Sequence, residues 1–106
     1  MIEMSNKTVY LSGGITGVHD YIGAFAEAKR IVAAAGASVI INPAELPSGW
    51  EWEHYMAACL GVLRCADAVV MLPGWRQSRG AVIEHGQAVI QRIPCYELAE
   101  VVSCAK

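Results

Sequence analysis

The sequence predicts an α/β protein, a Rossmann-like or flavodoxin-like three-layer sandwich with a short parallel sheet of four to five strands. Three observations support this prediction. Short apolar or β-branched runs alternate with segments of helical periodicity, the connections between them are short, and the run Ala66–Leu72 is apolar on both faces from Ala68 onward. A chain of 106 residues is enough for one compact domain, so residues 1–106 are expected to form a single domain.

The first half of the chain contains a predicted strand, a helix and a second strand. Thr8–Ser12 is a short apolar run that ends at Gly13-Gly14, where a loop through residue 21 begins. Apolar residues at helical spacing then predict a helix over Ile22–Ala35, which Gly36 closes at a position that favours a left-handed backbone. Ala37–Ile41 is short and β-branched, and this pattern predicts the second strand.

The second half repeats this alternation. A polar connection leads into a predicted helix over Trp52–Cys65, and the largely apolar segment Ala66–Leu72 follows as the third strand. Arg79–Arg92 is the third predicted helix, and Ile93–Tyr96 is the fourth strand. The tail, Glu97–Cys104, is expected to be helical.

The composition of the chain limits the kinds of partner that we expect. The hydrophobic fraction is 55% and the mean hydropathy is +0.36, so part of the apolar surface is expected to lie in a homodimer or homotetramer interface. No run approaches the roughly 18 apolar residues of a membrane helix, and the first residues lack the apolar core of a signal peptide. We therefore expect a cytoplasmic protein without a membrane partner. A net charge of −2 without a basic cluster argues against duplex nucleic acid.

The cysteines and histidines do not have metal-ligand spacing. The cysteines form no CxxC pair and are expected to be reduced thiols among apolar residues, and the histidines are scattered. These residues are Cys59, Cys65, Cys95, Cys104, His19, His54 and His85. No metal and no cofactor are therefore expected.

Ligands of parallel α/β sheets bind beyond the carboxyl ends of the strands, so the loops after the first and third strands become candidates. The glycines Gly13-Gly14-x-x-Gly17 do not have the GxGxxG spacing, and Asn42 stands where a ribose-binding acid is expected. A nicotinamide cofactor is therefore not predicted. Asp67 opens its strand and so lies on the wrong side of the sheet for a phosphate-accepting receiver domain.

Two features of the third helix attract attention. Ser78, Arg79 and Gly80 stand at its start, where free backbone amides favour an anion; the alternative is an ordinary serine N-cap. Further along, Glu84 has small helical neighbours, Gly80 and Ala81 one turn before it and Ala88 one turn after it. A carboxylate with room beside it can attack a sugar carbon, whereas the simpler alternative is a carboxylate that faces water near a helix start.

A wider resemblance links these features. The segments VYLSGGITG, INPAE, WEHYM, ADAVVMLPGW and SRGAVIEHGQA, in this order, resemble small bacterial and phage proteins of unassigned function related to nucleoside 2-deoxyribosyltransferases. The similarity runs from about Thr8 to Tyr96. It implies a relation to deoxynucleoside 5′-monophosphate N-glycosidases, in which a helix glutamate attacks C1′ of the sugar and releases the base.

The resemblance also assigns roles. It implies that Glu84 is the nucleophile, that Tyr10 hydrogen-bonds it, and that Ser78 holds the 5′-phosphate. The expected substrate-binding residues are those of the two candidate loops: Gly13, Gly14, Ile15, Thr16, Asp20, Trp75, Ser78, Arg79 and Gly80. Cys59 stands where these enzymes usually have an aspartate that assists departure of the base. Either another acid, with Asp20 the best placed, substitutes, or the chemistry is slow or absent.

The sequence thus predicts an N-glycosidase or deoxyribosyltransferase that acts on a nucleoside 5′-monophosphate through a covalent glycosyl-glutamate intermediate. A binding module of the same fold, which senses or sequesters a nucleotide without turnover, is the first alternative. A structural subunit of a larger assembly is the second.

Overall fold

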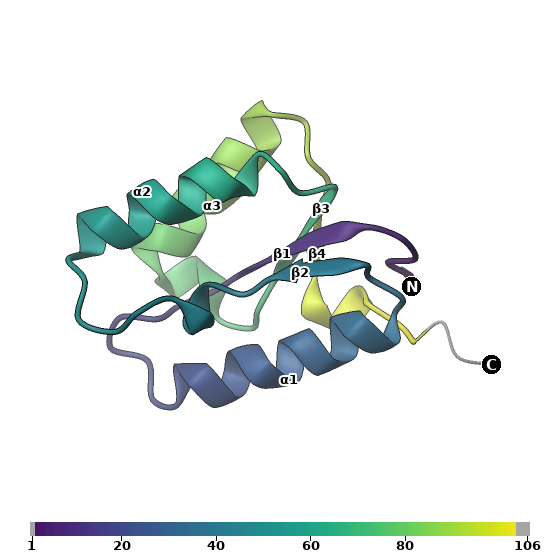
Figure 1. The fold of residues 1–106 in the computed structure, drawn as a ribbon, viewed down its shortest axis with the longest axis horizontal. Helices are drawn as coiled ribbons and strands as arrows, with labels where there is room; N and C mark the ends of the chain where they lie inside the picture. Colours follow the sequence, from purple (N-terminus) through teal and green to yellow (C-terminus); the bar gives the residue numbers. More distant parts are fainter. Residues whose placement is uncertain (1, 104–106) are drawn as a thin grey trace.

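The computed structural model describes residues 2–103 and contains a four-stranded parallel sheet in the order β2-β1-β3-β4. Three α-helices connect the strands, as Figure 1 shows. The elements in chain order are β1 (Thr8–Ser12), α1 (Tyr21–Ala34), β2 (Val39–Ile41), α2 (Trp52–Leu63), β3 (Ala68–Met71), α3 (Arg79–Ile90) and β4 (Cys95–Glu97). The predicted α/β architecture is confirmed.

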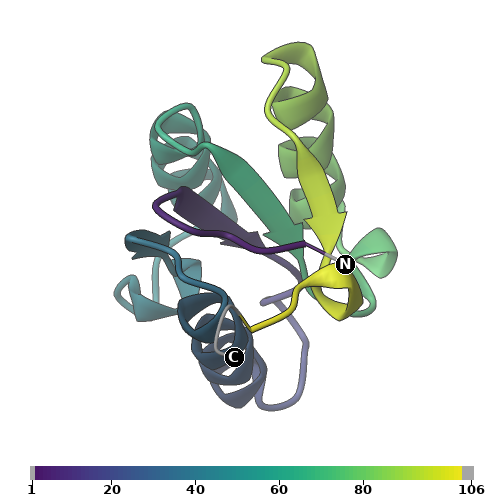
Figure 2. The ribbon, with the colours of Figure 1, turned by 90° about the vertical axis from the view of Figure 1, so that its right-hand side faces the viewer.

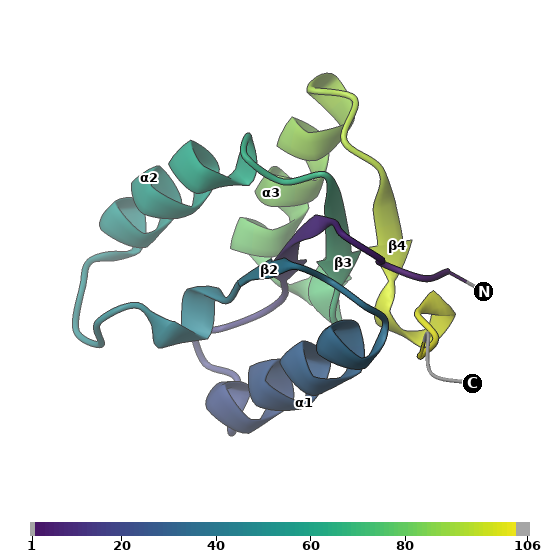
Figure 3. The same ribbon diagram turned by 45° about the vertical axis from the view of Figure 1, so that its right-hand side comes forward.

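The helices form two layers around the sheet. Helix α1 covers one face, and α2 and α3 cover the other (Figures 2 and 3). The two faces of β1 show how the sequence divides between these layers. Val9 and Leu11 pack in the core that includes α1, whereas Tyr10 packs in the core that includes α2 and α3. Successive residues of a strand point to opposite faces, so Ser12 shares the face of Tyr10.

The buried central strands follow directly from their composition. Every residue of β3 is buried, which confirms the prediction drawn from the run that is apolar on both faces. Helix α1 buries Phe25, Ala28 and Val32, whereas Ile22, which the helical pattern had included, is 60% exposed. Gly36 has φ +100°, as expected of the residue that closes α1.

The tail prediction was wrong. Instead of a helix over Glu97–Cys104, the strand β4 continues to Glu97, and a single 3-10 turn follows at Leu98–Glu100. Val101 then forms a parallel bridge with Ile2. This pairing of two distant segments needs an extended backbone, which a local helical pattern does not reveal. Cys104 lies outside the described residues.

The other predicted boundaries differ from the observed ones by one to two residues, which is common at the ends of helices and strands. Helix α1 begins one residue early because Asp20 caps it, and α2 ends at Leu63 instead of Cys65. In residues 2–103, no helix is both long enough and apolar enough to span a membrane.

Candidate active site

A buried carboxylate lies between the sheet and α3. Glu84 is 5% exposed, and each of its oxygens accepts one hydroxyl hydrogen bond. Tyr10 Oη donates to Oε2 at 2.7 Å, and Ser12 Oγ donates to Oε1 at 2.6 Å. Short distances of this kind are typical of hydroxyls bound to an ionised acceptor. The carboxylate is therefore held at both oxygens.

Local sequence explains this placement. Tyr10 and Ser12 are two residues apart on β1, so both hydroxyls reach the same face of the sheet. Ala81 and Ala88 of α3 are buried against that face, and their small side chains let the helix approach closely. The small neighbours of Glu84 therefore bring it to the sheet.

Burial dominates the electrostatics of this cluster. Desolvation raises the pKa of Glu84 above its usual value, and hydrogen bonds from Ser12, Tyr10 and Cys59 oppose that rise. Burial also raises the pKa of Tyr10 far beyond its usual range, so its hydroxyl keeps its proton. Desolvation raises the pKa of the Cys59 thiol to about 11. Glu84 is thus surrounded by three neutral donors.

A cleft of about 460 Å³ opens beside Glu84. Its walls come from the loop after β1, the first two turns of α2 and the start of α3, and Glu84 and Cys59 line it. A volume of this size is within the range of small-molecule sites. The cleft lies at the carboxyl ends of β1 and β3, where ligands of parallel sheets bind.

The starts of α2 and α3 meet at this cleft. Ser78 caps α3, because its Oγ accepts a hydrogen bond from the Ala81 amide at 3.2 Å. The Arg79 guanidinium lies 4.4 Å from the centre of the Trp52 ring, a cation–π contact between the two helices. A Cβ added to Gly80 would lie 3.1 Å from Met56 Sδ, so glycine permits this close approach.

Most of the predicted site residues gather at the cleft. Seven of them line it: Gly13, Ile15, Thr16, Ser78, Arg79, Gly80 and Glu84. Tyr10 lies behind Glu84 on the sheet side.

Three of the predicted substrate-binding residues do not line it. Gly14 faces a second hollow, next to Val18. Asp20 is exposed and caps α1 by accepting a hydrogen bond from the Gly23 amide. Trp75 is buried, stacks on His85 and donates to Glu97.

Sequence reasoning missed Ser12 and the α2 wall. Ser12 stands two residues after Tyr10, and this period-2 spacing was the signal that could have identified it. The wall consists of Trp52, Glu53, Tyr55 and Met56, together with Gln77 from the loop before α3. No spacing rule within α2 distinguishes such a wall from an ordinary exposed helix face.

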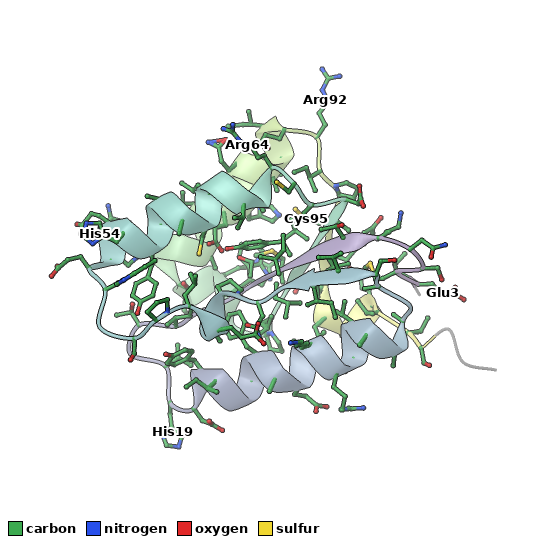
Figure 4. All side chains as sticks on the ribbon, viewed as in Figure 1. Glu3, His19, His54, Arg64, Arg92 and Cys95 are labelled. Atoms are coloured by element: carbon green, nitrogen blue, oxygen red, sulfur yellow. The ribbon has the colours of Figure 1, made fainter. Side chains whose placement is uncertain are left out.

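The described histidines and cysteines do not converge. Figure 4 shows His19 in the loop before α1 and His54 near the start of α2, well apart from each other. Within residues 2–103, no group of three or more His, Cys, Asp or Glu residues has the arrangement of a metal site.

The fold and the cleft define a class of protein: a small parallel α/β domain with a buried, doubly hydrogen-bonded carboxylate at the edge where ligands bind. Residues 7–96 match the model of a family described as a domain of unknown function, DUF4406. The chain belongs to this family. No curated protein and no solved structure matches the chain.

Proposed function

We propose that the protein cleaves the N-glycosidic bond of a nucleoside 5′-monophosphate, with Glu84 as the nucleophile. The carboxylate attacks C1′ of the sugar, the C1′–N bond breaks, and its electron pair leaves with the base. Water or a second base then attacks C1′ of the glycosyl-glutamate ester, and the carboxylate is released. Two displacements at C1′ retain its configuration.

One observation supports this proposal above the others: a carboxylate 5% exposed lines the cleft while two hydroxyls hold it from the sheet. A carboxylate that served only to cap or solubilise a helix would face water. Burying this group costs free energy, and pKa values perturbed in this way cluster at functional sites.

Free base released from nucleotides tests the proposal. The protein is incubated with ribo- and deoxyribonucleoside 5′-monophosphates, and chromatography measures the base, while thermal shift measures binding. Base release from one of these nucleotides is the expected result. Neither base release nor a thermal shift with any of them would contradict the proposal and favour a structural subunit.

Cys59 favours one alternative, a nucleotide-binding module without turnover. Its thiol, with a pKa raised to about 11, is a poor proton donor for a leaving base. A thermal shift without base release would support this alternative.

We expect the cleft to bind a nucleoside 5′-monophosphate about tenfold to a hundredfold more tightly than the free nucleoside. The phosphate would meet the Ser78 hydroxyl, the Arg79 guanidinium and the first amides of α3, and a charge-assisted contact contributes roughly 1.5–3 kcal/mol. Titration calorimetry measures both affinities.

A matched pair of variants distinguishes a direct contact between Arg79 and the phosphate from the effect of removing one positive charge anywhere near the site. Arg79→Gln should reduce the preference for the monophosphate. Arg76→Gln should not, because Arg76 instead approaches Glu97. Equal affinity of the wild type for nucleoside and monophosphate would contradict the expected phosphate contact.

A homodimer or homotetramer is the expected assembly, because large apolar side chains remain exposed on the outer side of α3 and on α2. They are Val62, Val82, Ile83, Val89 and Ile90, with Ile90 75% exposed. Light scattering at tens of micromolar should show more than one chain, and Ile90→Lys should shift the mass toward the monomer. Ile22→Lys, on the opposite layer, is the control. A monomeric wild type would disprove the expectation.

A further inference from the structure

The serine at the end of β1 is entirely buried and has a single polar side-chain partner among the described residues. Ser12 is 0% exposed, and its Oγ donates to Glu84 Oε1 at 2.6 Å. A buried hydroxyl needs an acceptor, and a neighbouring backbone carbonyl is a common one. Here the hydroxyl instead reaches a carboxylate 72 positions further along the chain.

The Ser12 hydroxyl contacts Glu84 from the sheet side, away from the cleft. Glu84 lines the cleft, whereas Ser12 and Tyr10 do not. An ionised carboxylate offers about four lone-pair sites. Two donors on the sheet side therefore leave lone pairs available toward the cleft, and together they fix the plane of the group.

From this geometry we infer that Ser12 is a positioning residue, whose hydroxyl orients the Glu84 carboxylate for attack on the sugar. The inference rests on the proposed function, because it assigns Ser12 a part in that reaction. Ser12 does not touch the cleft, so it acts only through Glu84. With one donor per oxygen, the carboxylate cannot rotate about its Cγ–Cδ bond without losing both hydrogen bonds.

The neutral character of the donor also matters. Among residues 2–103, Glu84 forms no ion pair, and its side-chain hydrogen bonds come from the hydroxyl groups of Ser12 and Tyr10 and from the thiol of Cys59, all of them neutral. Burial raises the pKa of Glu84, and the hydrogen bond from Ser12 is the largest of the effects that lower this pKa. Loss of the Ser12 hydroxyl should therefore leave less of the ionised nucleophile at a given pH.

Kinetics of Ser12→Ala test the role in turnover. We expect kcat to fall about tenfold to a hundredfold, as loss of a hydrogen bond to a charged group does, with KM unchanged. The acid limb of the pH–rate profile should move to higher pH. Ser12→Thr, which keeps the hydroxyl, should restore both; Ser38→Ala, at an exposed serine, is the control.

A measurement on the ligand-free protein distinguishes failure of this inference from failure of the proposed function. Carbon-13 NMR of the Glu84 side-chain carboxyl gives its titration midpoint, which Ser12→Ala should raise. If Ser12→Ala does not fold, Ser12→Cys provides a weaker donor of similar size and an intermediate midpoint is expected. Absence of base release from the wild type counts against the proposed function alone. An unchanged midpoint in the folded variant overturns the role of Ser12.

Discussion

Glu84→Gln is expected to reduce the rate of base release by several orders of magnitude while nucleotide binding stays nearly intact. An amide cannot form the glycosyl ester, whereas the size of the side chain is retained. Its carbonyl oxygen can still accept one of the two hydroxyls of Tyr10 and Ser12, and its NH2 group can donate to the oxygen of the other. The loss should therefore fall on kcat, because the carboxylate acts mainly on the transition state. Single-turnover kinetics and titration calorimetry measure the two effects separately.

The same variant carries an internal check on stability. Because the pKa of Glu84 is raised in the folded state, the native protein binds its proton more tightly than the unfolded chain does. The free energy of unfolding of the wild type should fall as pH rises from about 4.5 through this raised pKa. Glu84→Gln lacks this titration, so its stability relative to the wild type should increase with pH.

Glu51→Gln is the matched control, since Glu51 is exposed, precedes α2 and makes no side-chain capping bond. It should leave rate and stability unchanged. A Glu84→Gln variant that loses folding stability and activity in equal measure would mark Glu84 as structural and contradict its role as the nucleophile.

Cys59→Asp is expected to raise the rate of base release by roughly 10²–10⁴-fold, the usual contribution of a positioned acid. The thiol lies beside Tyr10 and Glu84 in the cleft, so the introduced carboxyl group would form a pair with Glu84. Two adjacent carboxyl groups do not both ionise readily. Since Ser12 and Tyr10 favour the ionised form of Glu84, the proton should stay on the introduced group, which can then donate it to the base.

Cys59→Asn and Cys59→Ala provide the comparison, because they replace the thiol without adding an acid. Burying a polar group at this 5% exposed position should cost about 1–3 kcal/mol of unfolding free energy, measured by denaturant titration. A Cys59→Asp rate no higher than that of Cys59→Asn would place the acid elsewhere. Glu53, which lines the cleft, is then the residue to test, whereas Asp20 lies outside it.

Sequence patterns were sufficient for the fold because its main signals are local. The run that is apolar on both faces forms the buried strand β3, and helical periodicity located α1, α2 and α3 to within a few residues. The tail could not be predicted, because Val101 pairs with Ile2 at the other end of the chain.

The candidate site was partly predictable for the same reason. Glu84 and the α3 start lie at a strand–loop–helix junction that the rule for parallel sheets identifies. Asp20 and Trp75 lie in the same kind of loop, but a helix cap and a buried packing position hold their side chains elsewhere. Packing between distant segments decides which of several loop residues points toward a cleft. Patterns in a single sequence do not contain that information.

The contact between Arg79 and Trp52 gives the cleft an optical reporter of its own. An indole under a guanidinium, in a wall of the cleft, has an emission spectrum that depends on that cation and on access of water. Trp50→Phe and Trp75→Phe together would leave Trp52 as the only fluorophore of its kind. An anion that draws Arg79 off the ring should then change the emission of Trp52, so that occupancy of the cleft can be followed in real time without a label.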